Sequence, residues 1–156
     1  MPNKYKIDEG KTKMSEIQII KRNGNKDTLD LEKLHKVVFY ACNGINGVSA
    51  SEVEIKSSLQ FYSGITSSEV QETLIKSAAD LISEEQPNYQ WVAGRLICYH
   101  LRKMVYGQFE PCHILELVQR NIDQGFYAQE LLEKYSTEDW EELNAHLRHY
   151  RDESMT

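Results

Sequence analysis

The sequence predicts a mainly α-helical fold, in which a small β-hairpin caps a four-helix bundle and a short helical extension follows. Apolar residues recur at helical spacing over most of the chain, while one stretch near the N-terminus has apolar runs on both sides of an Asn-Gly pair. A chain of 156 residues with 40% apolar content is long enough for one proper core and a small appended one.

The N-terminal stretch divides into a leader and a hairpin. Residues 1–14 are polar and lack an apolar period, which predicts a disordered leader. An Asn23-Gly24 turn then suits the positive φ angles of a tight hairpin. The apolar and β-prone residues expected on its two strands are Ile17, Ile19, Ile20, Thr28 and Leu29.

The first two helices are predicted from their caps and breaks. Asp30 is a plausible N-cap for a helix that ends near Asn43-Gly44. A second helix opens at Ser49 or Ser51, where the spacing from Ser51 to Glu54 is that of a capping box. We expect this second helix to close just before Gly64.

Two longer helices follow, and a helical extension completes the chain. One starts at Ser67 or Ser68 and is stopped by Pro87, while the other covers residues 89–106 and is apolar on most sides, as expected for the centre of a bundle. Beyond Gly107, two or three short helices are expected with breaks at Gly125 and Ser136.

Composition excludes several classes of protein. The net charge of −6 argues against general nucleic-acid binding. The excess of Asp and Glu over Lys and Arg is concentrated in residues 107–156. The sequence has neither a signal peptide nor a membrane span, which predicts a cytoplasmic protein without a membrane partner. Cys42, Cys98 and Cys112 are too widely spaced for a zinc site or a disulfide framework, so we interpret them as reduced and without a functional role.

Histidines and aromatic residues are more simply explained by packing than by chemistry. His35 and His100 fall on apolar helix faces and are interpreted as core histidines. The aromatic residues have the helical spacing of an ordinary core rather than that of a cofactor site. They are Phe39, Tyr40, Phe61, Tyr62, Tyr89, Trp91 and Tyr99.

A cluster of cations at the hairpin turn is the first candidate site. Lys21 and Arg22 lie beside Gly24, a residue that lets a ligand approach the backbone closely, and Lys33 follows at the start of the next helix. Such a cluster can hold a polyphosphate. The alternative is that Lys-Arg-Asn-Gly is only a solvated hairpin tip.

Further motifs follow this cluster in a fixed order: Asp30-x-x-Lys33-Leu34, Gly64-Ile65-Thr66-Ser67, Ala93-x-Arg95-Leu96, and Leu101-Arg102-Lys103 before Tyr106-Gly107. The set resembles the ATP-cone, the N-terminal allosteric module of class I ribonucleotide reductase large subunits, of phage or bacterial type. This resemblance continues past the cone from Ile17 to near the end of the chain. It implies an ATP-cone over residues 15–106 and the helical start of the reductase N-terminal domain over residues 107–156.

The resemblance also implies a set of nucleotide contacts. Lys21, Arg22 and Lys33 would hold the triphosphate, and Lys103 would be a second phosphate anchor. Other members of the family place polar residues near the adenine and sugar, apolar walls around the base, and a hydroxyl contact at the matching positions. Those positions are Asp27 and Asp30, Leu29 and Leu34, and Ser67, respectively.

One position departs from the family pattern. Bacterial members that are inhibited by dATP usually carry a histidine near the nucleotide sugar, where this chain has Gln71. Glutamine can donate and accept hydrogen bonds but cannot become cationic. The resemblance therefore implies ATP binding, whereas Gln71 replaces the residue that the family associates with inhibition by dATP. The expected effector is ATP or dATP with Mg²⁺.

The resemblance implies regulation without catalysis. The reductase reaction needs catalytic cysteines on a large barrel, which we expect on the remainder of the large subunit or on a separate chain, so residues 1–156 alone should be inactive. The expected partners are that catalytic portion and the reductase small subunit. A helical adaptor with a degenerate nucleotide site remains an alternative, whereas an ATP-cone transcription regulator lacks support because no zinc-ligand pairs are present.

Overall fold

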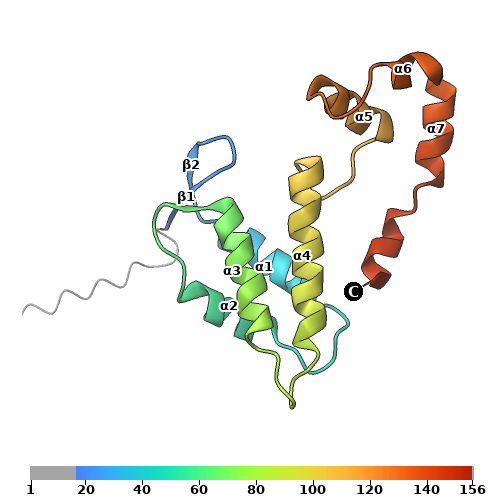
Figure 1. Ribbon diagram of the computed structural model, residues 1–156. Helices are drawn as coiled ribbons and strands as arrows, with labels where there is room; N and C mark the ends of the chain where they lie inside the picture. The colour runs from blue at the N-terminus through green and yellow to red at the C-terminus, as the bar shows by residue number, and fades with distance from the viewer. Residues whose placement is uncertain (1–16, 156) are drawn as a thin grey trace, which may run out of the picture. The chain divides into compact units, whose positions relative to one another are not determined.

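The computed structural model describes residues 17–155, so the predicted leader at residues 1–14 lies outside the described part. The chain forms two compact units, one extending to Leu96 and the other starting at Ile97. Helix α4 (Tyr89–Tyr106) begins in the first unit and ends in the second (Figure 1). The mainly α-helical class with a small β cap is confirmed.

The β cap is a three-stranded sheet rather than a hairpin alone. Strand β1 (Gln18–Ile20) pairs antiparallel with β2 (Lys26–Thr28) across the predicted turn. Gly24 has a φ of 79°, a value that glycine adopts without strain, and its N–H donates to the Lys21 carbonyl at 2.9 Å. A third strand, β3 (Ile65–Thr66), pairs parallel with β1 on its other side.

The helices of the first unit begin at well-formed caps. Asp30 is the N-cap of α1 (Leu31–Cys42), and its carboxylate accepts a hydrogen bond from the Lys33 N–H at 3.0 Å. Helix α2 covers Ala50–Ser58. Helix α3 (Ser67–Ala79) starts directly after β3 with Thr66 as its N-cap in a reciprocal capping box with Glu69.

The core of the first unit lies among these helices and under the sheet. The side chain of Tyr89 is fully buried, its hydroxyl accepts from the Ser49 N–H at 2.9 Å, and it donates to Glu52. This contact ties the start of α4 to the start of α2. The apolar core residues of this unit are Ile17, Leu29, Leu34, Val37, Val38, Ala41, Val53, Ile65, Val70, Leu74, Ala78, Val92, Ala93 and Leu96.

The second unit contains the end of α4 and the predicted extension. Its helices are α5 (Ile114–Asp123), α6 (Glu130–Lys134) and α7 (Thr137–His146), followed by the 3-10 helix η2 (His149–Met155). Gly125, with a φ of 77°, follows α5, and Ser136 caps α7, which confirms both predicted breaks. Val118 and Trp140 are its buried apolar residues.

Several local predictions were wrong. Ser49, one of the two predicted starts, is the N-cap of α2, but the predicted Ser51–Glu54 capping box is absent. Helix α3 ends at Ala79, well before Pro87. His35 is exposed, and its Nδ1 forms a hydrogen bond of 2.7 Å with the Glu54 side chain of α2 rather than packing in the core. His100 is half-buried, and its Nδ1 has no hydrogen-bond partner among the described residues.

The aromatic residues are also less buried than predicted. Tyr89 belongs to the core, whereas Phe39, Tyr62 and Trp91 expose 58%, 55% and 45% of their surface. Helix α4 is buried on one face of its first two turns and exposes apolar side chains beyond Leu96. Helical spacing alone predicts neither which aromatic face is covered nor by what.

The remaining composition-based expectations concern thiols and membranes. Cys42, Cys98 and Cys112 are half-buried free thiols, and burial raises the pKa of Cys42 to about 11, which keeps it protonated at neutral pH. Within residues 17–155, no helix combines the length and apolar character needed to cross a membrane.

Candidate functional site

The hairpin turn presents two adjacent cations at the end of β1. Lys21 follows Ile20 directly, and its N–H donates to the Asn25 carbonyl at 2.8 Å, which closes the turn. The Lys21 ammonium forms an ion pair with Asp27 across the hairpin. A hydrogen bond from Lys21 is the largest cause of a lowered pKa at Asp27, so this carboxyl is charged at neutral pH. Arg22 is the next residue in the exposed turn.

The start of α1 repeats this pairing of an acid with a lysine. Asp30 caps the helix, and the Lys33 backbone N–H lowers the pKa of its carboxyl. The Lys33 ammonium lies 3.6 Å from the other Asp30 oxygen, and its side chain is 80% exposed. Lys33 is therefore held only weakly and can turn toward a stronger anion.

Strand β3 brings the start of α3 close to the hairpin turn. Ile20 pairs with Thr66 in the parallel register of β1 and β3, so Lys21 and Ser67 each follow one member of the same residue pair. Ser67 is the first residue of α3, whose N-terminus carries a partial positive charge from the helix dipole. Figure 1 shows the sheet at the end of α3 from which this helix starts.

Gln71 lies one helical turn after Ser67, on the same face of α3. Its Oε1 atom is buried and has no hydrogen-bond partner among the described residues. A buried amide oxygen without a donor is unfavourable, and native proteins seldom keep one without a reason. A polar ligand at this face of α3 would supply the missing donor.

The other predicted site residues lie in different settings. Leu29 and Leu34 are 6% and 7% exposed, so their side chains belong mostly to the core and offer little surface to a base. Lys103 lies on the part of α4 in the second unit, with its ammonium 5.0 Å from the centroid of the Tyr99 ring.

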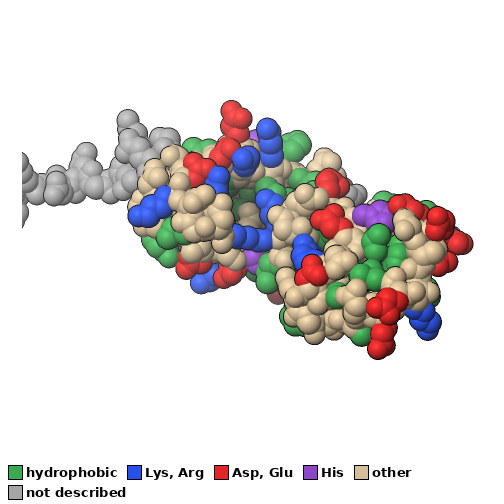
Figure 2. All heavy atoms as spheres, turned by 90° about the horizontal axis from the view of Figure 1, so that it is seen from above, with side chains coloured by type: hydrophobic (Ala, Val, Ile, Leu, Met, Phe, Trp, Pro, Cys, Tyr) green, Lys and Arg blue, Asp and Glu red, His purple; other side chains and the backbone are tan. Residues whose placement is uncertain are grey.

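The surface around the sheet has mixed charge. Figure 2, which is seen from above the view of Figure 1, shows Lys and Arg side chains among Asp and Glu side chains over the first unit. A hollow in this sheet is lined by Gln18, Ile19, Ile20, Lys26, Ser63 and Gly64. The described residues contain no group of three or more His, Cys, Asp or Glu side chains that could hold a metal ion.

Sequence reasoning missed two features of this site. Strand β3 is only two residues long, too short for any alternation to be visible, although Gly64 before it and the Thr66 to Glu69 capping spacing after it mark the place. The unsatisfied oxygen of Gln71 is a property of packing, and no sequence pattern indicates it.

Comparison with known proteins identifies the family to which this chain belongs. The model of the ATP cone domain matches residues 17–104. The chain is 46% identical over 134 residues to the ribonucleoside-diphosphate reductase subunit alpha of Buchnera aphidicola subsp. Schizaphis graminum, covering 86% of this chain and 18% of that protein.

Two further relatives agree with this match. The ribonucleoside-diphosphate reductase 1 subunit alpha of Escherichia coli K12 is 43% identical over 134 residues, which are 86% of this chain and 18% of that protein. The corresponding subunit alpha of enterobacteria phage T4 is 37% identical over 145 residues, which are 92% of this chain and 19% of that protein. The chain thus spans about a fifth of the length of these relatives, at their N-terminal end, and it belongs to the ATP cone domain family.

Proposed function

We propose that this chain binds ATP or dATP through its ATP cone and acts as an allosteric segment of a ribonucleoside-diphosphate reductase large subunit. The observation that carries the proposal is the β1–β3 register, because it sets the cationic hairpin turn beside the start of α3. A helix N-terminus next to converging lysine and arginine side chains is a favourable environment for phosphates.

The cations of the first unit suit a triphosphate. Its charge of about −4 needs several cations, and Lys21, Arg22 and Lys33 supply three of them. Lys21 and Lys33 are paired with Asp27 and Asp30 in the structure, so we infer that each lysine exchanges a carboxylate for a phosphate when nucleotide binds. Lys103 is proposed as a further phosphate contact by family likeness.

The polar groups of α3 suit the nucleoside. The Ser67 hydroxyl and the Gln71 amide lie one turn apart, and the unsatisfied Gln71 Oε1 can accept a hydrogen bond from the adenine amino group or a ribose hydroxyl. ATP and dATP differ only in the ribose 2′-hydroxyl. A neutral amide at this position gives a smaller difference between the two nucleotides than a histidine that can become charged.

A regulatory role follows from what accompanies the cone in its relatives. The relatives are reductase alpha subunits about five times longer than this chain. We propose that nucleotide in the cone shifts how the catalytic portion of the large subunit associates with other copies and with the small subunit. Such a shift requires the nucleotide to bind one associated state more tightly than another. Mg²⁺ would accompany the triphosphate.

Calorimetric titration with ATP and with dATP, both with Mg²⁺, tests the proposal. Replacing Lys21 and Arg22 together by alanine should weaken binding at least about tenfold, since two phosphate contacts are lost. Lys36→Ala is the matched control because Lys36 is an exposed lysine of α1 outside the site, and it should leave the affinity unchanged. Absence of binding by the unmodified chain would contradict the proposal and favour a helical adaptor.

A further inference from the structure

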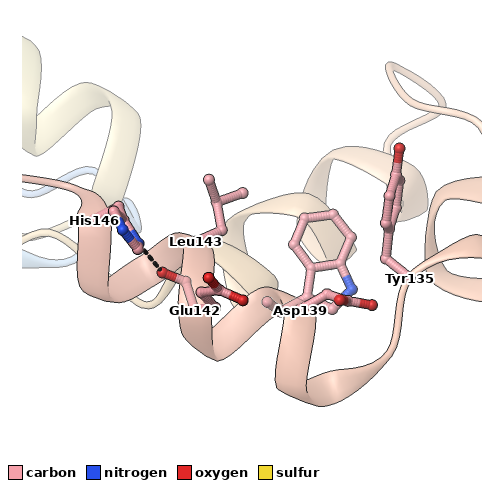
Figure 3. Close-up of a pocket in the computed structure, with 6 residues that line it drawn as sticks. Tyr135, Asp139, Glu142, Leu143 and His146 are labelled. Atoms are coloured by element: carbon pink, nitrogen blue, oxygen red, sulfur yellow. Dashed lines mark hydrogen bonds between the residues drawn. The ribbon is translucent and has the colours of Figure 1, made fainter.

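The second unit holds a cavity of about 550 Å³ along α7. It is lined by Tyr135, Asp139, Trp140, Glu142, Leu143 and His146. Figure 3 shows Tyr135 and Leu143 directed to the same side of α7, with Asp139 and Glu142 along the helix between them. The His146 ring is fixed by a hydrogen bond of 2.7 Å to the Glu142 carbonyl. Aromatic, aliphatic and acidic side chains thus share one hollow.

The charge of this hollow is negative. Asp139 is held in place because its carboxylate accepts from the Ser136 N–H at 2.8 Å in the capping box of α7. Glu142 is exposed beside it. Residues 107–156 carry eleven Asp and Glu against four Lys and Arg, so the surroundings add to the negative potential. A cationic occupant is therefore favoured over an anionic one.

The aromatic walls suit a cation as well. The rings of Tyr135 and Trp140 meet edge to face, with centroids 5.7 Å apart and planes at 76°. The Lys134 ammonium already lies 5.4 Å from the centroid of the Tyr135 ring. This contact shows that the Tyr135 ring accepts an ammonium group in this structure.

Trp140 supplies an independent indication of a ligand. It is 8% exposed, it lines the cavity, and its Nε1 is buried without an acceptor among the described residues. An indole N–H in such a position is left unsatisfied unless an occupant brings an acceptor. A simple organic cation has none, whereas a peptide has a carbonyl at every residue.

We propose that this cavity binds a basic peptide segment of another polypeptide. An arginine or lysine head group lies against Tyr135 and the Glu142 carboxylate, and a main-chain carbonyl of the segment accepts from Trp140 Nε1. An apolar neighbour in the segment covers Leu143, which is 46% exposed. The volume exceeds what one ammonium group fills, which favours a segment of a few residues over a free amine.

The test uses a fluorescein-labelled pentapeptide of alternating leucine and arginine (Leu-Arg-Leu-Arg-Leu), titrated by fluorescence anisotropy. Glu142→Lys should weaken binding at least about tenfold. Glu116→Lys makes the same change of charge on an exposed residue of α5 that does not line the cavity, and it should weaken binding by less than about twofold. Equal losses in the two variants would overturn the proposal, because they indicate general attraction to an acidic surface.

A second readout follows the indole groups. The chain has two tryptophans, so ¹⁵N-labelled protein shows two indole signals, and Trp140→Phe assigns them. The peptide should shift the Trp140 signal and leave that of Trp91 in place. A stationary Trp140 signal would refute the predicted hydrogen bond, and equally tight binding of free arginine amide would refute the peptide as the occupant.

Discussion

Replacing Gln71 by methionine should have opposite effects on folding and on nucleotide binding. Methionine keeps the length of the side chain and removes the amide, including the buried Oε1 that lacks a donor. An unsatisfied buried acceptor costs about 1–3 kcal/mol, so Gln71→Met should raise the free energy of unfolding of the nucleotide-free chain by about 1 kcal/mol. The same change removes a contact to the nucleotide, so ATP should stabilise the variant less than the unmodified chain.

The measurement is urea unfolding with and without ATP. At a concentration of 100 times Kd, ATP adds about 2.7 kcal/mol to the unmodified chain, and a tenfold loss of affinity reduces this gain to about 1.4 kcal/mol. Gln60→Met is the matched control, because the Gln60 amide donates to Ser77 Oγ at 3.1 Å and to the Lys56 carbonyl at 3.3 Å. It should lower the free energy of unfolding by about 1 kcal/mol and leave the ATP effect intact.

Two results would contradict this role of Gln71. If Gln71→Met destabilises the nucleotide-free chain as Gln60→Met does, Oε1 is satisfied in solution. If ATP also stabilises the variant as much as the unmodified chain, the amide makes no contact with the nucleotide. Both results together would remove Gln71 from the site.

Three further predictions concern the fold. Tyr89→Phe should lower the free energy of unfolding, measured in urea, by about 2 kcal/mol, because the buried Tyr89 hydroxyl bonds two partners. Tyr62→Phe removes one exposed hydrogen bond of 3.4 Å and should lower it by less than about 0.5 kcal/mol. Equal losses in the two variants would contradict this prediction. Thr66→Ala should lower the free energy of unfolding by about 1 kcal/mol, because α3 loses its N-cap. An unchanged midpoint of urea unfolding would argue against that cap. The pKa values of Asp27 and Asp30 lie below 3.8. Their ionised carboxylates therefore contribute fully to the free energy of unfolding above pH 3.8, and this contribution is lost as the pH falls further. A melting temperature that does not change as the pH falls below 3.8 would refute this prediction.

The elements with strong periodicity or clear caps were predictable from the sequence. Asp30 and Ser136 were expected at helix starts or breaks and are N-caps, and the Asn23-Gly24 turn joins the first two strands as predicted. These features depend on residues close together in the chain, where a side chain and the backbone it caps are determined together.

Long-range features were not predictable in the same way. Pairing of Ile20 with Thr66 joins residues 46 positions apart, and the burial of Gln71 Oε1 depends on how α3 packs. His35 was placed in the core because its neighbours on α1 are apolar, but its partner Glu54 lies on α2 and keeps it at the surface. The candidate site follows the same division, since Lys21, Arg22 and Lys33 are local to the hairpin and α1, while their neighbours on α3 depend on the sheet.

In the proposed function, the hairpin turn and the start of α3 form one nucleotide site. Titration of the ¹⁵N-labelled chain with ATP and Mg²⁺, followed by amide chemical shifts, tests it most directly. We expect the amide signals of Lys21, Arg22 and Ser67 to shift together along one binding curve. Saturable binding that moves only signals of the second unit, or that leaves the Ser67 signal unmoved, would contradict it.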